Sequence, residues 1–249
     1  MERATIHEIF ASPQGEGPWL GERHIFVRFS GCDIRCRYCD TPAALEVRYS
    51  PEKPCRIQRA DAPDEFEEVP NPLSPAELTE FCRRFIIRGP SRPTLSLTGG
   101  EPLLQSSFLD EWLRAARSDF KIYLETNGIH ADAMKSLRDM IDIVSMDFKL
   151  PSATGLRPFW QEHKRFLSAA RGETIFVKAV VTKDTRRDDI VTSAFILSEF
   201  EASIPLILQP AGGRFAPEPA LLMEFQNAAL ALIQDVRVIP QAHKILNVP

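Results

Sequence analysis

The stretch Cys32-Asp-Ile-Arg-Cys36-Arg-Tyr-Cys39 spaces three cysteines as C-x3-C-x2-C and follows the apolar run His24–Phe29, which predicts a strand. Three thiolates on one short loop can bind three irons of a cubane cluster, because thiolates are the soft ligands that iron–sulfur clusters use. The fourth iron then has no protein ligand and stays open for a small molecule. The spacing therefore favours a 4Fe–4S cluster on Cys32, Cys36 and Cys39.

Two other interpretations of the three cysteines stay open. A structural zinc site needs four protein ligands, and the further donors in the chain, Cys55, Cys82 and His24, have no regular spacing relative to the loop. A loop that holds no metal is the other interpretation. A disulfide framework is disfavoured, because the cysteines are odd in number and three of the five lie in one short loop.

Length and composition indicate one large globular domain, or at most two small ones. The chain has 249 residues, of which 44% are apolar, so residues 1–249 can form one domain with a sizeable core. The net charge of −4 does not favour a nucleic-acid partner. The apolar runs are no longer than a strand and the N-terminus lacks a signal-peptide core, so we expect a cytoplasmic protein with no membrane segment.

Strand and helix signals alternate along most of the chain, which is typical of parallel β/α units with right-handed crossovers. There are too few units for a closed eight-fold barrel. We therefore expect an α/β fold, an open partial (β/α)6 TIM-like barrel. The strands are expected at His24–Phe29, Thr94–Leu97, Lys121–Glu125, Ile143–Asp147, Thr174–Val181, Pro205–Gln209 and Val236–Ile239, with a weaker one at Thr5–Phe10.

Two segments depart from this alternation. The stretch 42–73 is rich in proline and acidic residues and predicts a loop-rich insertion in place of the helix expected after the first strand. Ser74, Pro75 and Glu77 then form the capping box that begins a helix. At the other end, residues 245–249 are mostly apolar, which favours a docked tail over a frayed end.

Polar motifs follow the predicted strands, at the end where β/α folds carry their active sites. The glycines of TGGEP at residues 98–102 let the backbone approach a ligand closely, and its carboxylate can accept from an ammonium group. Glu125 either contacts a ligand or forms an ion pair with a residue on a neighbouring strand. Ser145, Asp147 and Lys149 share one face, and they either line a cavity or form a buried ion pair. The side chain of Lys178 points either into the barrel or away from it.

The cysteine spacing, the aromatic Tyr38 before the last cysteine and the GGEP motif together resemble the radical SAM superfamily. In that superfamily the open iron binds the amino and carboxylate groups of S-adenosylmethionine (SAM), and SAM cleavage yields a radical that takes hydrogen from the substrate. The resemblance implies a 4Fe–4S cluster and SAM as cofactors. It implies SAM contacts by Tyr38, Cys39, Asp40, Gly99, Gly100, Glu101, Glu125, Ser145, Asp147, Lys149 and Gln209.

Further segments resemble one family within this superfamily, the 7-carboxy-7-deazaguanine synthases. They are residues 6–10 (IHEIF), 12–17 (SPQGEG), 26–32 (FVRFSGC), 39–41 (CDT), 208–210 (LQP) and 241–246 (QAHKIL). The resemblance implies a lyase that converts 6-carboxy-5,6,7,8-tetrahydropterin into 7-carboxy-7-deazaguanine with loss of ammonia, in queuosine and other 7-deazapurine biosynthesis. It implies substrate contacts by Pro13, Gln14, Gly15, Glu16, Arg28, Thr98, His243 and Pro249, with Glu16 and Arg28 as catalytic residues and Mg²⁺ on Thr41.

The resemblance also implies an electron donor such as flavodoxin or ferredoxin, and a homodimer. Two features depart from the family pattern: the insertion at 42–73 is long, and residues 145–149 read Ser-Met-Asp-Phe-Lys where the family often has Ser-Pro-Lys. Two other functions stay open. A glycyl-radical activase shares the cysteine spacing but needs a wide mouth for a protein substrate. A non-catalytic zinc or iron–sulfur module would not need the motifs at the strand ends.

Overall fold

The computed structural model describes residues 2–45, 53–172 and 174–249, and its strands form one ten-stranded mixed sheet. The strand order is β10-β9-β8-β7-β6-β5-β2-β1-β3-β4. The strands are β1 (Ile6–Pro13), β2 (Arg23–Phe29), β3 (Cys55–Gln58), β4 (Phe66–Val69), β5 (Thr94–Gly99), β6 (Lys121–Thr126), β7 (Ile143–Asp147), β8 (Thr174–Val181), β9 (Leu206–Pro210) and β10 (Val236–Val238). The helices are α1 (Pro75–Arg83), α2 (Ser106–Ala116), α3 (Ala131–Leu137), α4 (Pro151–Thr154), α5 (Trp160–Ala169), α6 (Arg187–Phe200), α7 (Pro219–Leu230) and α8 (Ala242–Leu246).

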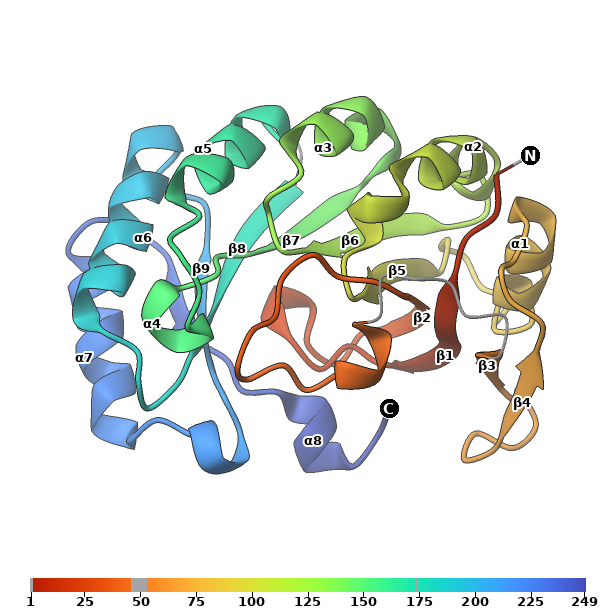
Figure 1. The fold of residues 1–249 in the computed structure, drawn as a ribbon, viewed down its shortest axis with the longest axis horizontal. Helices are drawn as coiled ribbons and strands as arrows, with labels where there is room; N and C mark the ends of the chain where they lie inside the picture. Colours follow the sequence, from red (N-terminus) through yellow and green to blue (C-terminus); the bar gives the residue numbers. More distant parts are fainter. Residues whose placement is uncertain (1, 46–52, 173) are drawn as a thin grey trace.

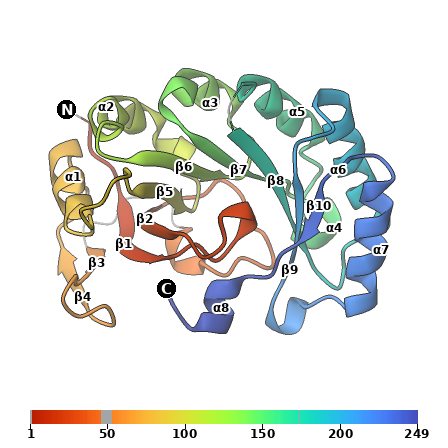
Figure 2. The ribbon, with the colours of Figure 1, turned by 180° about the vertical axis from the view of Figure 1, so that it is seen from behind.

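β2 pairs in parallel with β5, and each strand from β5 to β10 pairs in parallel with the next; these strands carry the β/α units. Figures 1 and 2 show α2, α3, α5, α6 and α7 along the outer side of this curved sheet, and α8 with the C-terminus on its other side. The two ends of the strand order, β10 and β4, do not pair with each other, so the sheet stays open. The expected open partial (β/α)6 barrel is confirmed.

The predicted capping box begins α1. The Ser74 hydroxyl accepts from the Glu77 N–H at 3.4 Å, and the Glu77 carboxylate accepts from the Ser74 N–H at 2.8 Å. Pro75 occupies the first turn, where a missing N–H costs no hydrogen bond. A cap of this kind stabilises a helix by about 1 kcal/mol, and here it also fixes the apolar side of α1, with Leu78 and Cys82 fully buried.

Within the predicted loop-rich insertion at 42–73, the structure contains two short strands that the sequence did not predict. β3 and β4 form an antiparallel hairpin, and β3 extends the sheet by pairing in parallel with β1. The hairpin precedes the crossover helix α1 and does not replace it. Each of its strands spans only four residues, too few for their alternation to stand out among the prolines. Residues 46–52 of the predicted insertion lie outside the described residues.

The interior of the open barrel is closed at the amino-terminal ends of its strands. Trp19 packs there edge-on against Tyr123, with ring centroids 6.0 Å apart, and against Phe176 at 5.6 Å. Ile143 and Ile207 complete this small buried cluster. Space for a ligand is therefore left at the carboxyl ends of the strands.

In the described part of the chain, no helix combines the length and apolar character needed to cross a bilayer.

Candidate active site

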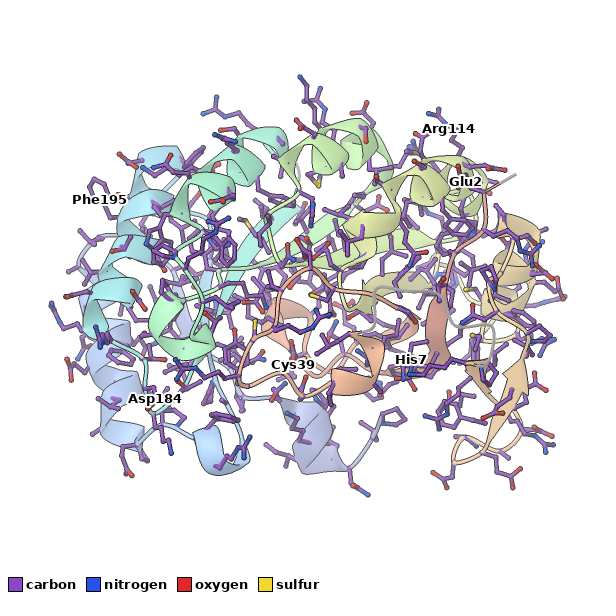
Figure 3. All side chains as sticks on the ribbon, in the orientation of Figure 1. Glu2, His7, Cys39, Arg114, Asp184 and Phe195 are labelled. Atoms are coloured by element: carbon purple, nitrogen blue, oxygen red, sulfur yellow. The ribbon has the colours of Figure 1, made fainter. Side chains whose placement is uncertain are left out.

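A cavity of about 440 Å³ opens at the carboxyl ends of the parallel strands, and its volume is typical of a small-molecule site. Figure 3 shows Cys39 on the loop that leaves β2, on the side of the sheet away from α2, α3 and α5. Every site residue expected from the sequence lines the cavity except Glu101. These residues are Pro13, Gln14, Gly15, Glu16, Arg28, Cys32, Cys36, Tyr38, Cys39, Asp40, Thr41, Thr98, Gly99, Gly100, Glu125, Ser145, Asp147, Lys149, Gln209, His243 and Pro249.

The three cysteines of the loop after β2 all carry free thiols that line the cavity. The base of this loop is held by the Gly31 N–H, which donates to the carbonyl of Ala44 at 2.8 Å. Burial raises the pKa of the Cys32 thiol to about 11 and also raises the pKa of Cys36. Bound iron reverses this effect, because a cation at the sulfur stabilises the thiolate.

The donors needed for a zinc site do not join the loop. Cys55 and Cys82 are fully buried in the main hydrophobic core, and burial raises the pKa of Cys55 to about 12. His24 is also buried, with its Nδ1 2.7 Å from the Ser96 hydroxyl. Over the described ranges, no three His, Cys, Asp or Glu side chains converge on a position for one metal ion. Three thiols without a fourth ligand suit a cluster, which spreads its ligands over several irons.

Gly99 and Gly100 bring the end of β5 against the base of the cysteine loop. Gly99 has a φ of 123°, and a Cβ there would lie 2.3 Å from the carbonyl oxygen of Phe29. A Cβ on Gly100 would lie 1.9 Å from the carbonyl oxygen of Gly31. Side chains are therefore excluded at both positions, and bare backbone faces the cavity beside the thiols.

Glu101 does not lie where the sequence suggested. Its side chain is fully buried and does not line the cavity. Its carboxylate accepts from the Leu103 N–H at 3.1 Å, the Thr126 hydroxyl at 2.9 Å and the Asn127 N–H at 2.7 Å. Burial raises the pKa of Glu101 in spite of these bonds. These three bonds join the ends of β5 and β6, and because the carboxylate has no exposed surface, the structure gives the expected contact with SAM no support.

Asp147 and Lys149, at the end of β7, line the cavity and also form an ion pair with each other. The two interpretations of this segment, a cavity wall and a buried ion pair, are therefore both correct. Lys149 Nζ lies 2.8 Å from Asp147 Oδ2 and 6.0 Å from the centre of the Tyr38 ring. Burial disfavours the Lys149 ammonium, but Asp147 and Cys36 outweigh it and raise the pKa of Lys149. Asp147 Oδ1 is buried and has no hydrogen-bond partner among the described residues. Ser145 lies beside it on the same wall.

Glu16 is held by three donors from distant parts of the chain. Its Oε1 accepts from Gln209 at 3.0 Å and from Gln241 at 2.8 Å, and its Oε2 pairs with the Lys178 ammonium. Lys178 also lies 3.8 Å from Asp147 Oδ2. Burial opposes the charge of both partners, yet their attraction dominates, so the pKa of Glu16 is lowered and the pKa of Lys178 is raised.

The sequence did not assign Lys178 or Gln241 to the site. Lys178 stands in the middle of the apolar strand β8 and alternates with Val177 and Ala179, which are fully buried in the main core. A charged residue at such a position is a signal for the interior of a barrel. Gln241 begins the segment 241–246 that resembles the family, but its local sequence did not indicate a contact with Glu16, because only the fold brings the two together.

Arg28 is oriented by a carboxylate on the neighbouring strand. Its Nε donates to Glu8 Oε1 at 2.7 Å, and its guanidinium lies 5.6 Å from the centre of the Phe10 ring. Its side chain is mostly buried, with 19% of its surface exposed. Among the described residues, none accepts from its two terminal nitrogens, which remain available for a planar anion.

Glu125 has neutral partners, unlike the ion pair considered from the sequence. The Thr98 hydroxyl donates to its Oε2 at 2.8 Å, and the Gln14 amide donates to its Oε1 at 3.2 Å. All three residues line the cavity. Glu125 therefore links the segment after β1 to the ends of β5 and β6.

The C-terminal segment lies against the segment after β1. The Ala242 N–H donates to the carbonyl of Gly15 at 2.9 Å, and the Ser12 hydroxyl donates to the Pro249 oxygen at the same distance. A Cβ on Gly15 would lie 2.2 Å from His243 Nδ1, so only glycine lets this ring approach. His243 and Pro249 thereby reach the cavity.

A second link joins the cysteine loop to α8. Asp40 Oδ2 accepts from Lys244 Nζ at 2.8 Å and from the Gln241 amide at 3.0 Å. Burial would raise the pKa of Asp40, but these two donors dominate and lower it. The Thr41 hydroxyl lies 3.3 Å from Asp40 Oδ1 and faces the cavity.

Comparisons with known proteins agree with this geometry. Residues 26–182 match the family model of the Radical SAM superfamily. The chain is 36% identical over 247 residues to 7-carboxy-7-deazaguanine synthase of Geobacter sulfurreducens, across 98% of this chain and 97% of that protein. It is 34% identical over 246 residues to the protein of the same name from Methanopyrus kandleri, across 98% and 93%. QueE from Escherichia coli has the same fold, with a TM-score of 0.57, 20% identity and coverage of 96% and 94%.

Proposed function

Because the chain belongs to the radical SAM superfamily and, within it, to the family of 7-carboxy-7-deazaguanine synthases, we propose that its cavity converts 6-carboxy-5,6,7,8-tetrahydropterin into 7-carboxy-7-deazaguanine with loss of ammonia. This lyase reaction serves 7-deazapurine (queuosine) biosynthesis. One observation carries the assignment of roles: the three thiols and the unused nitrogens of Arg28 face the same cavity. A metal site and an anion site thus lie within reach of one small ligand.

The cavity fits a 4Fe–4S cluster and SAM. Three cavity-facing thiols leave one iron without a protein ligand, and bare backbone at Gly99 and Gly100 lies beside them for the amino-acid end of SAM. When bound, these cofactors supply the 5′-deoxyadenosyl radical that takes hydrogen from the substrate. The residues proposed to hold SAM are Tyr38, Cys39, Asp40, Gly99, Gly100, Glu125, Ser145, Asp147, Lys149 and Gln209.

Arg28 binds the substrate carboxylate. A guanidinium presents parallel donors that match the two oxygens of a carboxylate, and both terminal nitrogens of Arg28 are unused by the described residues. Thr98 lies directly opposite Arg28 on β5 and lines the same wall. This contact places the carboxylated carbon of the pterin toward the cysteine loop.

Glu16 binds the N–H edge of the pterin ring. A carboxylate has about four acceptor positions, and three donors already occupy positions on Glu16, which fix its orientation and its charge. The remaining position accepts from a ring N–H or amino group. The residues proposed to enclose the pterin with Glu16 are Pro13, Gln14, Gly15, His243 and Pro249.

Mg²⁺ is held by the Thr41 hydroxyl together with substrate oxygens and water. Magnesium keeps several waters and needs few protein ligands. Thr41 faces the cavity, and Oδ2 of the neighbouring Asp40 already accepts from Lys244 and Gln241. Chelation of magnesium is therefore expected to slow turnover, and Thr41→Ala should show the same defect at saturating magnesium.

The reductant is a low-potential carrier such as flavodoxin or ferredoxin, because the cluster has to receive an electron before SAM is cleaved. All five thiols are unpaired, which agrees with a reducing compartment such as the cytoplasm. A homodimer is the assembly that we propose, and analytical ultracentrifugation of the reconstituted protein tests it.

The decisive experiment is anaerobic turnover. The protein is reconstituted with iron and sulfide, reduced, and incubated with SAM, Mg²⁺ and the carboxylated tetrahydropterin, and 7-carboxy-7-deazaguanine is detected by mass spectrometry. Arg28→Met should lower kcat/KM roughly 100-fold, since hydrogen bonds to charged groups contribute about 1.5–3 kcal/mol each. A reconstituted protein that cleaves SAM but leaves the pterin unchanged would contradict the proposal and favour the alternative of a glycyl-radical activase, which acts on a protein substrate.

A further inference from the structure

Charged side chains from three neighbouring strands form one row that ends at Arg28. Glu8 on β1 lies directly opposite Arg28 of β2 on one side and opposite Arg56 of β3 on the other. Directly opposed residues on neighbouring strands project from the same face of a sheet, with Cβ atoms about 5 Å apart. The row Arg56–Glu8–Arg28 therefore runs from the hairpin to the cavity wall, and we name it the charge row.

Glu8 divides its two oxygens between the two arginines. Oε1 accepts from Arg28 Nε at 2.7 Å, and Oε2 lies 3.6 Å from Arg56 Nη1. The Glu8 side chain is only 16% exposed, whereas Arg56 is 45% exposed. The contact with Arg28 is thus shielded from solvent, and the contact with Arg56 lies at its outer edge.

The outer end of the row is fixed by the hairpin. The Arg56 guanidinium lies 4.4 Å from the centre of the Phe66 ring on β4, a distance typical of a cation–π contact. Arg56 also pairs in register with Glu68 across the hairpin. The hairpin therefore holds the Arg56 guanidinium over the Phe66 ring of β4 and close to Glu8.

The signs of the charges in the row have a consequence for Arg28. Glu8 alone would cancel most of the positive charge that Arg28 offers to an anion, because the two are in direct contact. Arg56 adds a second positive charge on the far side of Glu8, so the Glu8 carboxylate is shared between two guanidinium groups and offsets the charge of Arg28 less than it would alone. The single contact to Nε fixes the plane of the Arg28 guanidinium and leaves its terminal donors toward the cavity.

We propose that Glu8 and Arg56 are positioning residues for substrate-carboxylate binding, and that the β3–β4 hairpin serves to carry Arg56. This inference rests on the proposed role of Arg28. Glu8 sets the orientation of the Arg28 guanidinium, and Arg56 offsets the charge of Glu8. The hairpin, which the sequence suggested only as an insertion, thereby takes part in substrate recognition without touching the substrate.

The test compares two ligands that differ in one group, the carboxylated tetrahydropterin and the tetrahydropterin that lacks the carboxylate. The Michaelis constant for the first and the inhibition constant for the second are measured in Arg56→Met, Glu8→Gln and Arg28→Met. Arg59→Met is the matched control, because Arg59 lies just beyond β3 and pairs with Asp61 and Glu65, away from Glu8. The affinity for SAM and the unfolding temperature are recorded for every variant.

Arg56→Met should raise the Michaelis constant for the carboxylated pterin about two- to five-fold, the effect of an exposed ion pair. Glu8→Gln should raise it roughly ten-fold, because a charged hydrogen bond becomes neutral. Neither variant should change inhibition by the ligand without the carboxylate, and Arg56→Lys should recover part of the loss. Arg59→Met should match the parent for both ligands.

The outcomes separate this inference from the proposed function. If Arg28→Met weakens both ligands equally, the proposed carboxylate contact is wrong. If Arg28→Met acts on the carboxylated ligand alone, while Glu8→Gln and Arg56→Met bind both ligands as the parent does, only the positioning role is overturned. It is also overturned if Arg56→Met weakens both pterins and SAM to the same extent, since that pattern indicates a general loss of structure.

Discussion

The cavity has two polar walls that handle charge in opposite ways. On the Arg28 wall, formed by β1, β2 and β5, the guanidinium uses one nitrogen on Glu8 and keeps its terminal donors unused by the described residues. On the Lys178 wall, formed by β7, β8 and β9, the charges neutralise one another in direct contact. Two acceptors on the Lys178 wall, Asp147 Oδ1 and Gln209 Oε1, are buried and have no hydrogen-bond partner among the described residues.

The difference between the walls orients a ligand. An unused cation attracts an anionic group, whereas a buried acceptor without a partner costs about 1–3 kcal/mol until a donor reaches it. A molecule with a carboxylate at one end and N–H groups at the other therefore fits in one direction only. SAM, with its ammonium, and the aminopyrimidine of a pterin both bring donors that the Lys178 wall can accept. The substrate proposed from the family membership matches this complementarity.

Removal of one thiolate has the largest expected effect, because the cysteine loop serves ligands on both walls. Cys36→Ala should lose the cluster after anaerobic reconstitution and give no detectable product, since two remaining thiolates hold a cubane poorly. Binding of the pterin to the Arg28 wall should persist in equilibrium dialysis. Cys82→Ala is the control, because Cys82 is buried in the core away from the cavity. An unchanged iron content in Cys36→Ala would contradict the ligand assignment.

The next effect comes from the Lys178 wall. Lys178→Met leaves Glu16 buried without its cation, and such a change typically destabilises a protein by about 3–5 kcal/mol. The lower part of this range is expected, because Gln209 and Gln241 still donate to the carboxylate. Urea unfolding near neutral pH measures the loss. Lys178→Arg, which keeps the charge, should recover most of the stability.

The same variant should make substrate binding depend on pH. In the parent the pKa of Glu16 is lowered, so its stabilising effect is present above the usual carboxyl pKa and is lost only as the pH falls through the lowered value. In Lys178→Met only the two amide donors oppose the effect of burial, and the pKa of Glu16 rises. From about pH 8 to about pH 6, the Michaelis constant for the pterin should then increase in the variant and stay flat in the parent. Parallel profiles would mean that Lys178 does not control the charge of Glu16.

Local chemistry was sufficient to predict the parallel part of the fold. The β5–α2–β6 region alternates strand and helix signals, and the capping box at Ser74 marks the start of α1. The hairpin escaped prediction because its stability comes from pairing with β1, a long-range contact that four-residue strands do not announce. Its prolines and acidic residues outweighed a short alternation of polar and apolar side chains.

The candidate site shows the same limit. Motifs at strand ends could be collected from the sequence because parallel strands bring their carboxyl ends together. The partners of those residues could not, since Gln241 and Lys178 reach Glu16 from over 160 positions away. Glu101 shows the converse: its motif suggested a ligand contact, but whether a carboxylate faces a cavity or three backbone and hydroxyl donors is decided by packing.

The smallest expected effect concerns the link between α8 and the cysteine loop. Lys244 and Asp40 are 43% and 47% exposed, so their ion pair is screened by solvent and contributes about 0.2–1 kcal/mol. Lys244→Met should therefore change kcat/KM no more than about five-fold, since the Gln241 amide still donates to Asp40. Lys164→Met is the control, because Lys164 forms a similarly exposed pair with Glu199 between α5 and α6. A larger loss in Lys244→Met alone would show that α8 holds the Arg28 and Lys178 walls at their working separation.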